Sequence, residues 1–517
     1  MTELKLKGAV AAGHAATAEA AAFALREGGN AFDAVIAAHW SACVAEPVLT
    51  SLGGGGFLLA QSEAGETSIY DFFTHTPRHK LPASGIDFHP IEADFGTTRQ
   101  EFHIGYGSVA TPGTVRGMFS IHRDLGSLPM PVLLEPAIEL ASKGLRINPL
   151  QAYILDVVRP IYLATPQAAQ RFASQSTPGR LVGEGELLQL PELAETLRAL
   201  AQEGERLFYE GDIATAIDAA CRSEGGQLRC ADLEQYQVRR RRPLHIQYRD
   251  AGFYTNPAPS SGGLLIGFAL KLLERHVQAG LSIDSVDGLS QLAELMQSTN
   301  QARLDGIRRN GLDERMLDPV LLEQYRHQVS GRARSFRGTT HISVIDRLGN
   351  LASLTASNGE GCGHMLGDTG IMLNNMLGEE DLNPHGFHAW QENRRLTSMM
   401  APSMLQLNDG RAIALGSGGS NRIRSAILQV LLRVVDEKLP LQQAIDRPRI
   451  HYENKLLNVE GGFEDPVYKQ LDKEFDQTRC WPDRNLFFGG VHAVSKNRTE
   501  FECHGDQRRG GVALSVF

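Results

Sequence analysis

Two short segments of alternating polar and apolar residues, 340–345 and 351–357, constrain the fold of this chain most strongly. They flank residues 347–349, a three-residue connection that ends in glycine, where a hairpin with a G1 bulge needs a left-handed residue. Antiparallel pairing about the middle of that turn puts Thr339 opposite Ser357. The sequence therefore predicts a β-hairpin whose open end brings two hydroxyl groups together.

One face of this hairpin is polar. Side chains alternate between the two faces of a strand, so the polar face carries Thr339, His341 and Ser343 on one strand and Ser353, Thr355 and Ser357 on the other. The pattern alone is explained by an edge hairpin with a solvated face. A chemical interpretation is that Thr339 is a nucleophile, which requires a cut before it, because the freed amine must serve as its base.

The rest of the chain mixes helical and strand patterns. Its 517 residues, 42% hydrophobic and 21% charged, fit a globular protein of two or three domains or one large layered core. Helical patterns cover 16–44 (two, separated at 28–30, where Asn30 can cap the second), 131–145, 189–203, 262–276 and 286–308. Strand patterns cover 55–61, 244–248, 371–374 and 412–415 besides the hairpin. Their irregular alternation favours an α+β or mixed architecture, with 331–338 as an exposed linker.

Charge and cysteine usage exclude several classes of protein. The formal net charge of -9 argues against a nucleic-acid partner, and we expect the arginine run 239–242 to be a solvated face or loop. The six cysteines show neither CxxC spacing nor paired clusters, so neither a zinc site nor a disulfide framework is indicated. No apolar leader segment and no run of about 20 apolar residues is present. We expect a cytoplasmic protein without a membrane partner.

Other local patterns do not indicate a cofactor or metal. The glycine run 53–56 lacks the GK[ST] of a phosphate loop, and 259–263 lacks the first glycine of a nucleophile elbow. His385 and His388 have no carboxylate in register and are interpreted as loop histidines. We expect no cofactor and no metal.

Several motifs occur together in one order along the chain. They are Gly29-Asn30-Ala31-Phe32-Asp33-Ala34, Gly53-Gly54-Gly55-Gly56-Phe57, Thr111-Pro112-Gly113-Thr114-Val115, Pro259-Ser260-Ser261-Gly262-Gly263, Gly338-Thr339-Thr340-His341-Ile342-Ser343-Val344, Gly370-Ile371-Met372-Leu373-Asn374-Asn375, Leu396-Thr397-Ser398-Met399-Met400-Ala401-Pro402 and Gly416-Ser417-Gly418-Gly419-Ser420-Asn421-Arg422-Ile423. In order and approximate spacing they resemble the large and small subunits of the γ-glutamyltransferase (γ-glutamyltranspeptidase) family. The resemblance spans nearly the whole chain.

This resemblance implies an N-terminal nucleophile hydrolase with a four-layer αββα sandwich. The precursor would cut itself between Gly338 and Thr339, and the fragments 1–338 and 339–517 would stay associated. Gly338 suits such a cut because glycine tolerates strained dihedrals and leaves its carbonyl open. Thr339 would be both nucleophile and carrier of the base, since its freed amine has a reference pKa of about 8. The acyl-enzyme would then pass its acyl group to water or to an amine.

The resemblance also places other site residues. Ser357 corresponds to the second hydroxyl opposite the nucleophile, and Gly418 and Gly419 to the pair whose N–H groups form the oxyanion hole. Asn358 corresponds to a substrate-binding asparagine. Thr397 and Ser398 match the serine pair that contacts the substrate carboxylate.

The sequence departs from the family where the glutamyl head is recognised. Phe73 stands at the position of the carboxylate-binding arginine, and an aromatic ring cannot replace a bidentate guanidinium. Glu379 stands near the position of the amine-binding aspartate. Unless Arg78, Arg99 or Arg116 takes over, the substrate carboxylate has lost its strongest partner.

Three hypotheses follow. The first is a self-processing enzyme that cleaves γ-glutamyl amides such as glutathione. The second is the same machinery acting on another small amide, of glutaryl or oxamate type. The third is an uncleaved binding protein that keeps the fold without catalysis.

Overall fold

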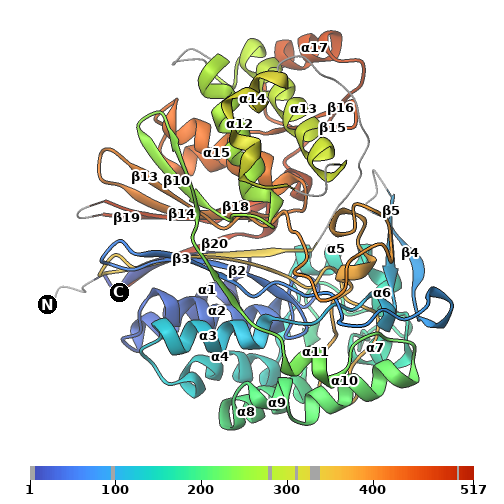
Figure 1. Cartoon of the computed structure of the whole chain (residues 1–517). Helices are drawn as coiled ribbons and strands as arrows, with labels where there is room; N and C mark the ends of the chain where they lie inside the picture. The colour runs from blue at the N-terminus through green and yellow to red at the C-terminus, as the bar shows by residue number, and fades with distance from the viewer. Residues whose placement is uncertain (1–5, 95–98, 277–281, 309–311, 326–337, 498–499) are drawn as a thin grey trace, which may run out of the picture.

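The structure is a computed structural model of the whole chain, and it describes residues 6–94, 99–276, 282–308, 312–325, 338–497 and 500–517. Two antiparallel sheets stack at its centre (Figure 1). In spatial order the first consists of β20 (Val512–Val516), β1 (Gly8–Ala12), β11 (Thr340–Asp346), β12 (Leu351–Ser357), β2 (Gly55–Gln61), β3 (Thr67–Asp71) and β8 (Arg239–Arg241). The second consists of β19 (Phe501–His504), β18 (Gly490–Lys496), β14 (Ala412–Gly418), β13 (Ser403–Leu407), β10 (Ala251–Thr255) and β9 (Leu244–Tyr248).

Helices cover the outer face of each sheet (Figure 1). On the first sheet these are α1 (Ala15–Arg26), α2 (Ala31–Ala45), α3 (Thr114–Leu125), α4 (Met130–Lys143) and, further out, α8 (Pro191–Glu203). On the second they include α12 (Ser261–His276), α13 (Val286–Arg308) and α15 (Arg422–Val435). Two hydrophobic clusters fill this arrangement, one centred on each set of helices. The α+β prediction and the four αββα layers are confirmed.

The hairpin predicted from the alternating segments lies in the middle of the first sheet. β11 pairs with β12 so that Thr340 faces Ala356 and Ile345 faces Leu351, which is the predicted register. β1 pairs with the other side of β11, and β2 with the other side of β12. The expectation of an edge hairpin is therefore wrong, because both strands have neighbours on each side.

Most predicted elements occur close to their expected bounds. The strand patterns at 55–61 and 244–248 are β2 and β9, and Asn30 caps α2 with a capping box to Asp33. The strand predicted at 371–374 is wrong: Met372 and Leu373 form only isolated bridges, to Met365 and Gly53. Its apolar residues are buried in a loop, which a short apolar run does not distinguish from a strand. Most of the predicted linker 331–338 lies outside the described residues.

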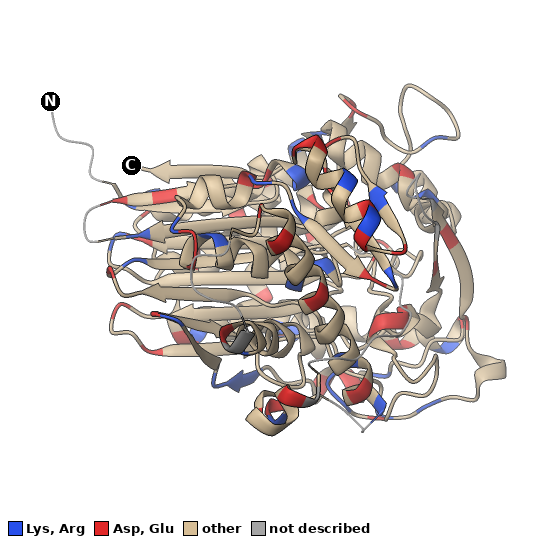
Figure 2. Cartoon of the chain, turned by 90° about the horizontal axis from the view of Figure 1, so that it is seen from above, with Lys and Arg blue, Asp and Glu red and all other residues tan. Residues whose placement is uncertain are grey.

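The arginine run is partly ordered as an edge strand. Arg239 and Arg240 are exposed on β8, as expected, but Arg241 forms an ion pair of 2.7 Å with the buried carboxylate of Asp71. Over the rest of the molecule, charged residues gather on the outer helices and loops, while the strands are mostly uncharged (Figure 2). Among the described residues, no helix is long and apolar enough to cross a membrane.

Asp346 ties the turn of the central hairpin to a helix. Its Oδ1 accepts hydrogen bonds from the N–H groups of Leu348, Gly349 and Asn350 at 2.9–3.0 Å. Its Oδ2 accepts one from the N–H of Ala31, at the first turn of α2. A carboxylate is favoured there by the helix dipole. The side chain is buried, so these N–H groups depend on it.

We expect Asp346→Ala to destabilise the protein by about 3–5 kcal/mol, because it leaves the buried N–H groups of Ala31 and Asn350 without their acceptor. Chemical denaturation measures the loss. Asp409→Ala is the matched control, since Asp409 is exposed and accepts a single backbone hydrogen bond, from Arg411, in the turn between β13 and β14. Equal losses in the two variants would contradict the anchoring role of Asp346.

Candidate active site

The open end of the central hairpin gathers two hydroxyl groups on one carbonyl. Thr339 Oγ1 donates to the carbonyl oxygen of Gly338 at 2.7 Å, and Ser357 Oγ donates to the same oxygen at 2.6 Å. Ser357 Oγ also accepts a hydrogen bond from the N–H of Gly359. The carbonyl that precedes Thr339 is thus polarised by both predicted catalytic hydroxyls.

Gly338 is held tightly on its other sides. Its N–H donates to Glu360 Oε1 at 2.9 Å. A Cβ at position 338 would lie 2.6 Å from the carbonyl oxygen of Gly359 and 2.9 Å from that of Val48, so only glycine fits without movement of the backbone. Close packing is therefore a physical reason for glycine at this position.

The polar face of the hairpin is buried between the two sheets. His341 lies 2.8 Å from Thr355 Oγ1 through Nδ1 and 2.9 Å from Ser343 Oγ through Nε2. Ser343 Oγ donates to the carbonyl of His492 on β18, and Ser353 Oγ to that of Leu415 on β14. Each polar side chain named here has a hydrogen-bond partner. The polar face can therefore pack in the protein interior and does not need contact with solvent.

His341 is neutral in this setting. Burial, with His492 nearby, holds the pKa of His341 well below its ordinary value. Its ring packs against Gly416, where a Cβ would lie 2.3 Å from the ring. Gly416 of β14 therefore lets the second sheet approach β11 closely.

The predicted oxyanion pair lies beside Thr339, the predicted nucleophile. A Cβ on Gly418 would lie 2.2 Å from the carbonyl oxygen of Thr339, so the backbone at the end of β14 abuts Thr339 directly. Gly419 follows with φ of 117°, which favours glycine, and its carbonyl accepts from the N–H of Arg422 at the start of α15. Thr339, Ser357, Gly418 and Gly419 are thus brought together.

Asn358 and Glu379 lie on either side of Gly359, next to this group. Asn358 Oδ1 accepts from Ser51 Oγ at 2.7 Å, while its buried Nδ2 has no hydrogen-bond partner in the part of the chain that the structure describes. The buried carboxylate of Glu379 is so close that a Cβ on Gly359 would lie 2.3 Å from it. Both side chains are buried, and their role as substrate-binding residues stays a prediction.

Thr397 and Ser398 bind the segment that begins α12. Thr397 Oγ1 donates to the carbonyl of Pro259 at 2.8 Å. The carbonyl oxygen of Ser398 accepts hydrogen bonds from Ser260 Oγ and from the N–H of Ser261. Ser398 Oγ accepts a hydrogen bond from the N–H of Met400. Both hydroxyls are engaged with the backbone, and the Thr397 hydroxyl and the Ser398 carbonyl hold two of the sequence motifs together.

Phe73 is part of the core. Its ring is 1% exposed and stacks on Phe57 at 5.4 Å, and its carbonyl accepts from the hydroxyl of Tyr236 and from Arg395. Arg395, directly before the 396–402 motif, was missed by sequence reasoning. Its guanidinium also donates to the carbonyl of Gln237 and pairs with Asp71 at 3.4 Å. The guanidinium of Arg395 is therefore engaged by partners within the protein.

Of the three arginines considered as replacements, the two whose side chains the structure describes, Arg116 and Arg78, have partners away from Thr339. Arg116 pairs with Glu205, donates to the carbonyl of Tyr236, and stacks over Tyr209. Arg78 donates to Asn393 Oδ1 and lines a separate polar cavity of about 420 Å³. Arg99 begins β5 (Arg99–Ile104), and its side chain lies outside the described residues.

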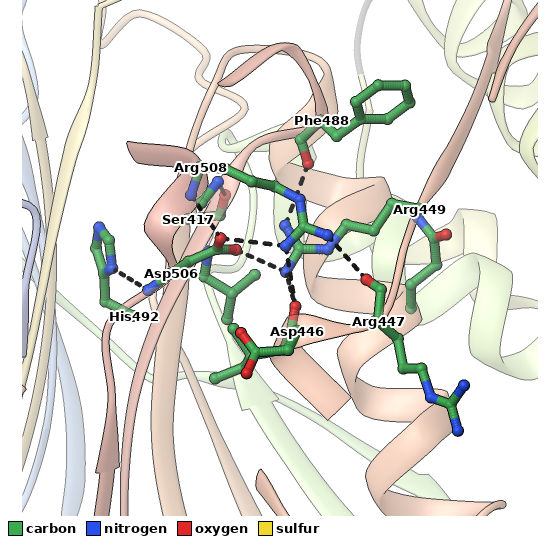
Figure 3. A network of polar contacts seen from close by, with 12 residues as sticks. Ser417, Asp446, Arg447, Arg449, Phe488, His492, Asp506 and Arg508 are labelled. Carbon is green, nitrogen blue, oxygen red and sulfur yellow. Dashed lines mark hydrogen bonds and ion pairs between the residues drawn. The ribbon is translucent and has the colours of Figure 1, made fainter. Parts of the chain in front are cut away.

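A buried ionic network supports the turn beside the end of β14 that carries Gly418 (Figure 3). Asp506 pairs with Arg449 at 2.7 Å and with Arg508 at 3.1 Å, and Arg508 makes two contacts of 2.7 Å with Glu460. Burial alone would raise the pKa of Asp506, but Arg449 and Arg508 outweigh it and hold that pKa below its usual range. The network fixes the 3-10 turn η7 (Gln507–Arg509), which carries Arg509.

Arg509 is the other residue that sequence reasoning missed. A Cβ on Gly418 would lie 3.2 Å from its Nη1, and a Cβ on Gly419 3.2 Å from its Nη2, so the guanidinium rests on the predicted oxyanion pair. No local signal links residue 509 to Thr339, because the contact depends on how β14, β18 and β20 are arranged around η7.

Comparison with known proteins agrees with this arrangement. The glutathione hydrolase proenzyme of Pseudomonas aeruginosa is 28% identical over 98% of this chain and 94% of that protein. The capsule biosynthesis protein CapD proenzyme of Bacillus anthracis is 30% identical over 97% of this chain and 90% of that protein. In fold, the chain is similar to the cephalosporin acylase from Bacillus halodurans, with a TM-score of 0.85 and 24% identity over 98% of this chain and 96% of that one.

The family model described as Gamma-glutamyltranspeptidase matches residues 17–516. The chain therefore belongs to the gamma-glutamyltranspeptidase family.

Proposed function

We propose that this chain is a self-processing γ-glutamyltransferase or glutathione hydrolase that works through Thr339. The observation that carries the proposal is the Gly338 carbonyl held between the hydroxyls of Thr339 and Ser357, at 2.7 and 2.6 Å. Relatives with this family's fold are named glutathione hydrolase proenzymes, which fits a chain made in an uncut form. Family membership makes the chain an enzyme, so the hypothesis of a non-catalytic binding protein is not kept.

Self-cleavage would begin at the Gly338 carbonyl. Thr339 Oγ attacks the carbonyl carbon while Ser357 Oγ stabilises the oxygen. The hydroxyl proton of Thr339 passes to the amide nitrogen, which leaves as the free amine of Thr339. The resulting ester between Gly338 and Thr339 is then hydrolysed by water. The products are fragment 1–338, ending in a carboxylate, and fragment 339–517, beginning with a free threonine.

The two fragments would stay together because both sheets combine strands from each. β11 of the second fragment pairs with β1 of the first, and β12 pairs with β2. In the second sheet, β10 of the first fragment pairs with β13 of the second. Separation would break these ladders and expose the buried faces of two sheets, so the fragment 1–338 is the proposed partner of 339–517.

The cut enzyme would then use the same atoms on a substrate amide. The Thr339 amine accepts the proton of Oγ, which attacks the substrate carbonyl, and the N–H groups at Gly418 and Gly419 receive the developing oxyanion. One such donor contributes roughly 10²- to 10³-fold in rate. The protonated amine of Thr339 returns its proton to the leaving nitrogen. Water or an acceptor amine then releases the acyl group from the Thr339 ester.

A second candidate is the same chemistry on a different small amide. It is favoured by one observation: Phe73 is in the core and the adjacent Arg395 is engaged by Asp71 and Tyr236, so the family's usual place for a carboxylate offers no open cation here. A glutaryl amide differs from a γ-glutamyl amide only by the missing amine. The cytoplasmic location stays a prediction.

Thr339→Ala should remain a single full-length band on a denaturing gel, while the unmodified chain gives fragments 1–338 and 339–517. Thr339→Ser should still be cut, because it keeps the hydroxyl. N-terminal sequencing of the smaller fragment should begin at Thr339. Cleavage that persists in Thr339→Ala would contradict the mechanism.

Ser357→Ala should slow self-cleavage by about 10-fold or more, since it removes one hydrogen bond to the reacting carbonyl, worth roughly 1–2 kcal/mol. The time course of band conversion measures the rate. Ser353→Ala is the matched control: it removes a buried hydroxyl from the same face of β12 that contacts Leu415 and the N–H of Ser403 instead. If Ser353→Ala slows cleavage equally, the effect of Ser357 is structural.

The cut enzyme should release p-nitroaniline from γ-glutamyl-p-nitroanilide and from glutaryl-p-nitroanilide. A higher kcat/KM with the γ-glutamyl donor supports the first candidate, because Glu379 or Asn358 then recognises the amine. A higher value with the glutaryl donor supports the second. Cleaved protein that releases p-nitroaniline from neither donor would contradict both.

A further inference from the structure

A narrow cavity of about 30 Å³ reaches the glycine at which self-cleavage would occur. Its polar wall includes Gly338, Glu360 and Arg509. The rest of the wall is mainly apolar and includes Leu49, Ile154, Val158 and Leu486. A cavity of this size has room for one or two water molecules, which the polar groups on its wall can bind.

Glu360 lies against the segment that would be cut. The residue is 1% exposed, and its Oε1 accepts a hydrogen bond from the N–H of Gly338 at 2.9 Å. The N–H of Glu360 donates to Asn375 Oδ1 at 3.0 Å, which fixes the backbone that carries the carboxylate. The amide nitrogen and the carbonyl carbon of one residue are roughly 2.5 Å apart. One bridging water therefore spans the gap from the carboxylate to the carbonyl carbon of Gly338.

The second step of the proposed self-cleavage requires a base. Water hydrolyses the ester between Gly338 and Thr339, and it attacks an ester slowly unless a base takes its proton. The hydroxyls of Thr339 and Ser357 already donate to the Gly338 carbonyl, and neither is basic near neutral pH. Among the described residues that line the cavity, Glu360 is the only carboxylate. A carboxylate oxygen that accepts one hydrogen bond keeps a second lone pair for water.

We propose that Glu360 is the general base that hydrolyses the ester intermediate of self-cleavage, acting on a water molecule in this cavity. The water oxygen bonds to the carbonyl carbon of Gly338 while its proton passes to the Glu360 carboxylate. The bond from that carbon to Thr339 Oγ then breaks, and Glu360 returns the proton to Oγ. The products are the carboxylic acid of Gly338, which ionises, and the hydroxyl of Thr339. This inference rests on the proposed function, since it assigns one step of the same self-cleavage.

Glu360→Gln is the informative variant, because its amide oxygen can still accept from the N–H of Gly338 but cannot take a proton from water. Uncut chains are made by brief cell-free translation, and band conversion is followed on denaturing gels with and without hydroxylamine at neutral pH. Hydroxylamine cleaves an ester without a general base and leaves a hydroxamate at Gly338. Mass spectrometry of the fragment 1–338 identifies that hydroxamate.

Glu46→Gln is the matched control. Glu46 is also a buried carboxylate, but it accepts from the hydroxyls of Thr17 and Thr340, each at 2.7 Å. It lines a neighbouring cavity of about 40 Å³, and Gly338 is not among the described residues that line that cavity. The two variants make the same chemical change, but only Glu360→Gln makes it beside the ester.

We expect Glu360→Gln to slow band conversion roughly 100-fold, at the lower end of what a positioned base contributes. Hydroxylamine should restore most of that rate, with the hydroxamate at Gly338. Hydroxylamine should accelerate Glu46→Gln no more than it accelerates the unmodified chain.

Three outcomes overturn the inference while the unmodified chain still cuts itself. If Glu360→Gln is cut at the unmodified rate, the freed amine of Thr339 is the base instead. If Glu360→Gln is slow and hydroxylamine does not accelerate it, Glu360 acts before the ester forms, by holding Gly338. An equal response of Glu46→Gln would make the effect a general one of buried carboxylates. Failure of the proposed function looks different, because then the unmodified chain is not cut at all.

Glu360→Asp covers the case in which Glu360→Gln shows no cooperative thermal unfolding and is therefore misfolded. Aspartate keeps the charge and the base but places them one methylene further from Gly338. This variant should be cut more slowly than the unmodified chain and should be accelerated by hydroxylamine. A slow Glu360→Asp variant whose rate hydroxylamine leaves unchanged would contradict the proposal.

Discussion

The site depends on the hydrogen-bonded pairing of β11 with strands on both of its sides. β12 fixes the register that places Thr339 opposite Ser357, and β1 holds the other edge of β11. A hairpin at the edge of a sheet could slip or fray, whereas a central strand cannot move without breaking two ladders. The positions of Thr339 and Ser357 are therefore fixed by strands from the chain before residue 339 as well as after it.

The buried polar face of the hairpin fixes the distance between the sheets. His341 bridges Thr355 and Ser343, and Ser343 and Ser353 reach across to carbonyls of β18 and β14. Such directional contacts define one relative position of the sheets, where apolar packing would tolerate several. That position brings Gly418 against Thr339.

The features that could be predicted from the sequence are those determined by residues close together in the chain. The turn after Asp346 sets the register of β11 and β12, and hence the contact of Ser357 with the Gly338 carbonyl, without help from distant segments. The capping box at Asn30 was equally local. The same reasoning misjudged the hairpin as an edge, because which strands flank it is decided by segments far away in the chain. For the same reason neither Arg395 nor Arg509 could be placed from sequence.

Arg508 and Arg509 are adjacent and have identical side chains, but their buried surroundings give them different partners. Arg508 is paired with Asp506 and Glu460, and Arg449 completes the network (Figure 3). Burying these charges is costly, and such a network defines a conformation better than it adds stability. Here the network defines the conformation of η7, the turn that carries Arg509. Its carboxylates pair with Arg508 and Arg449, so they position Arg509 and do not neutralise it. Within the part of the chain that the structure describes, the lack of an ion pair at the Arg509 guanidinium thus follows from the pairing of its neighbour.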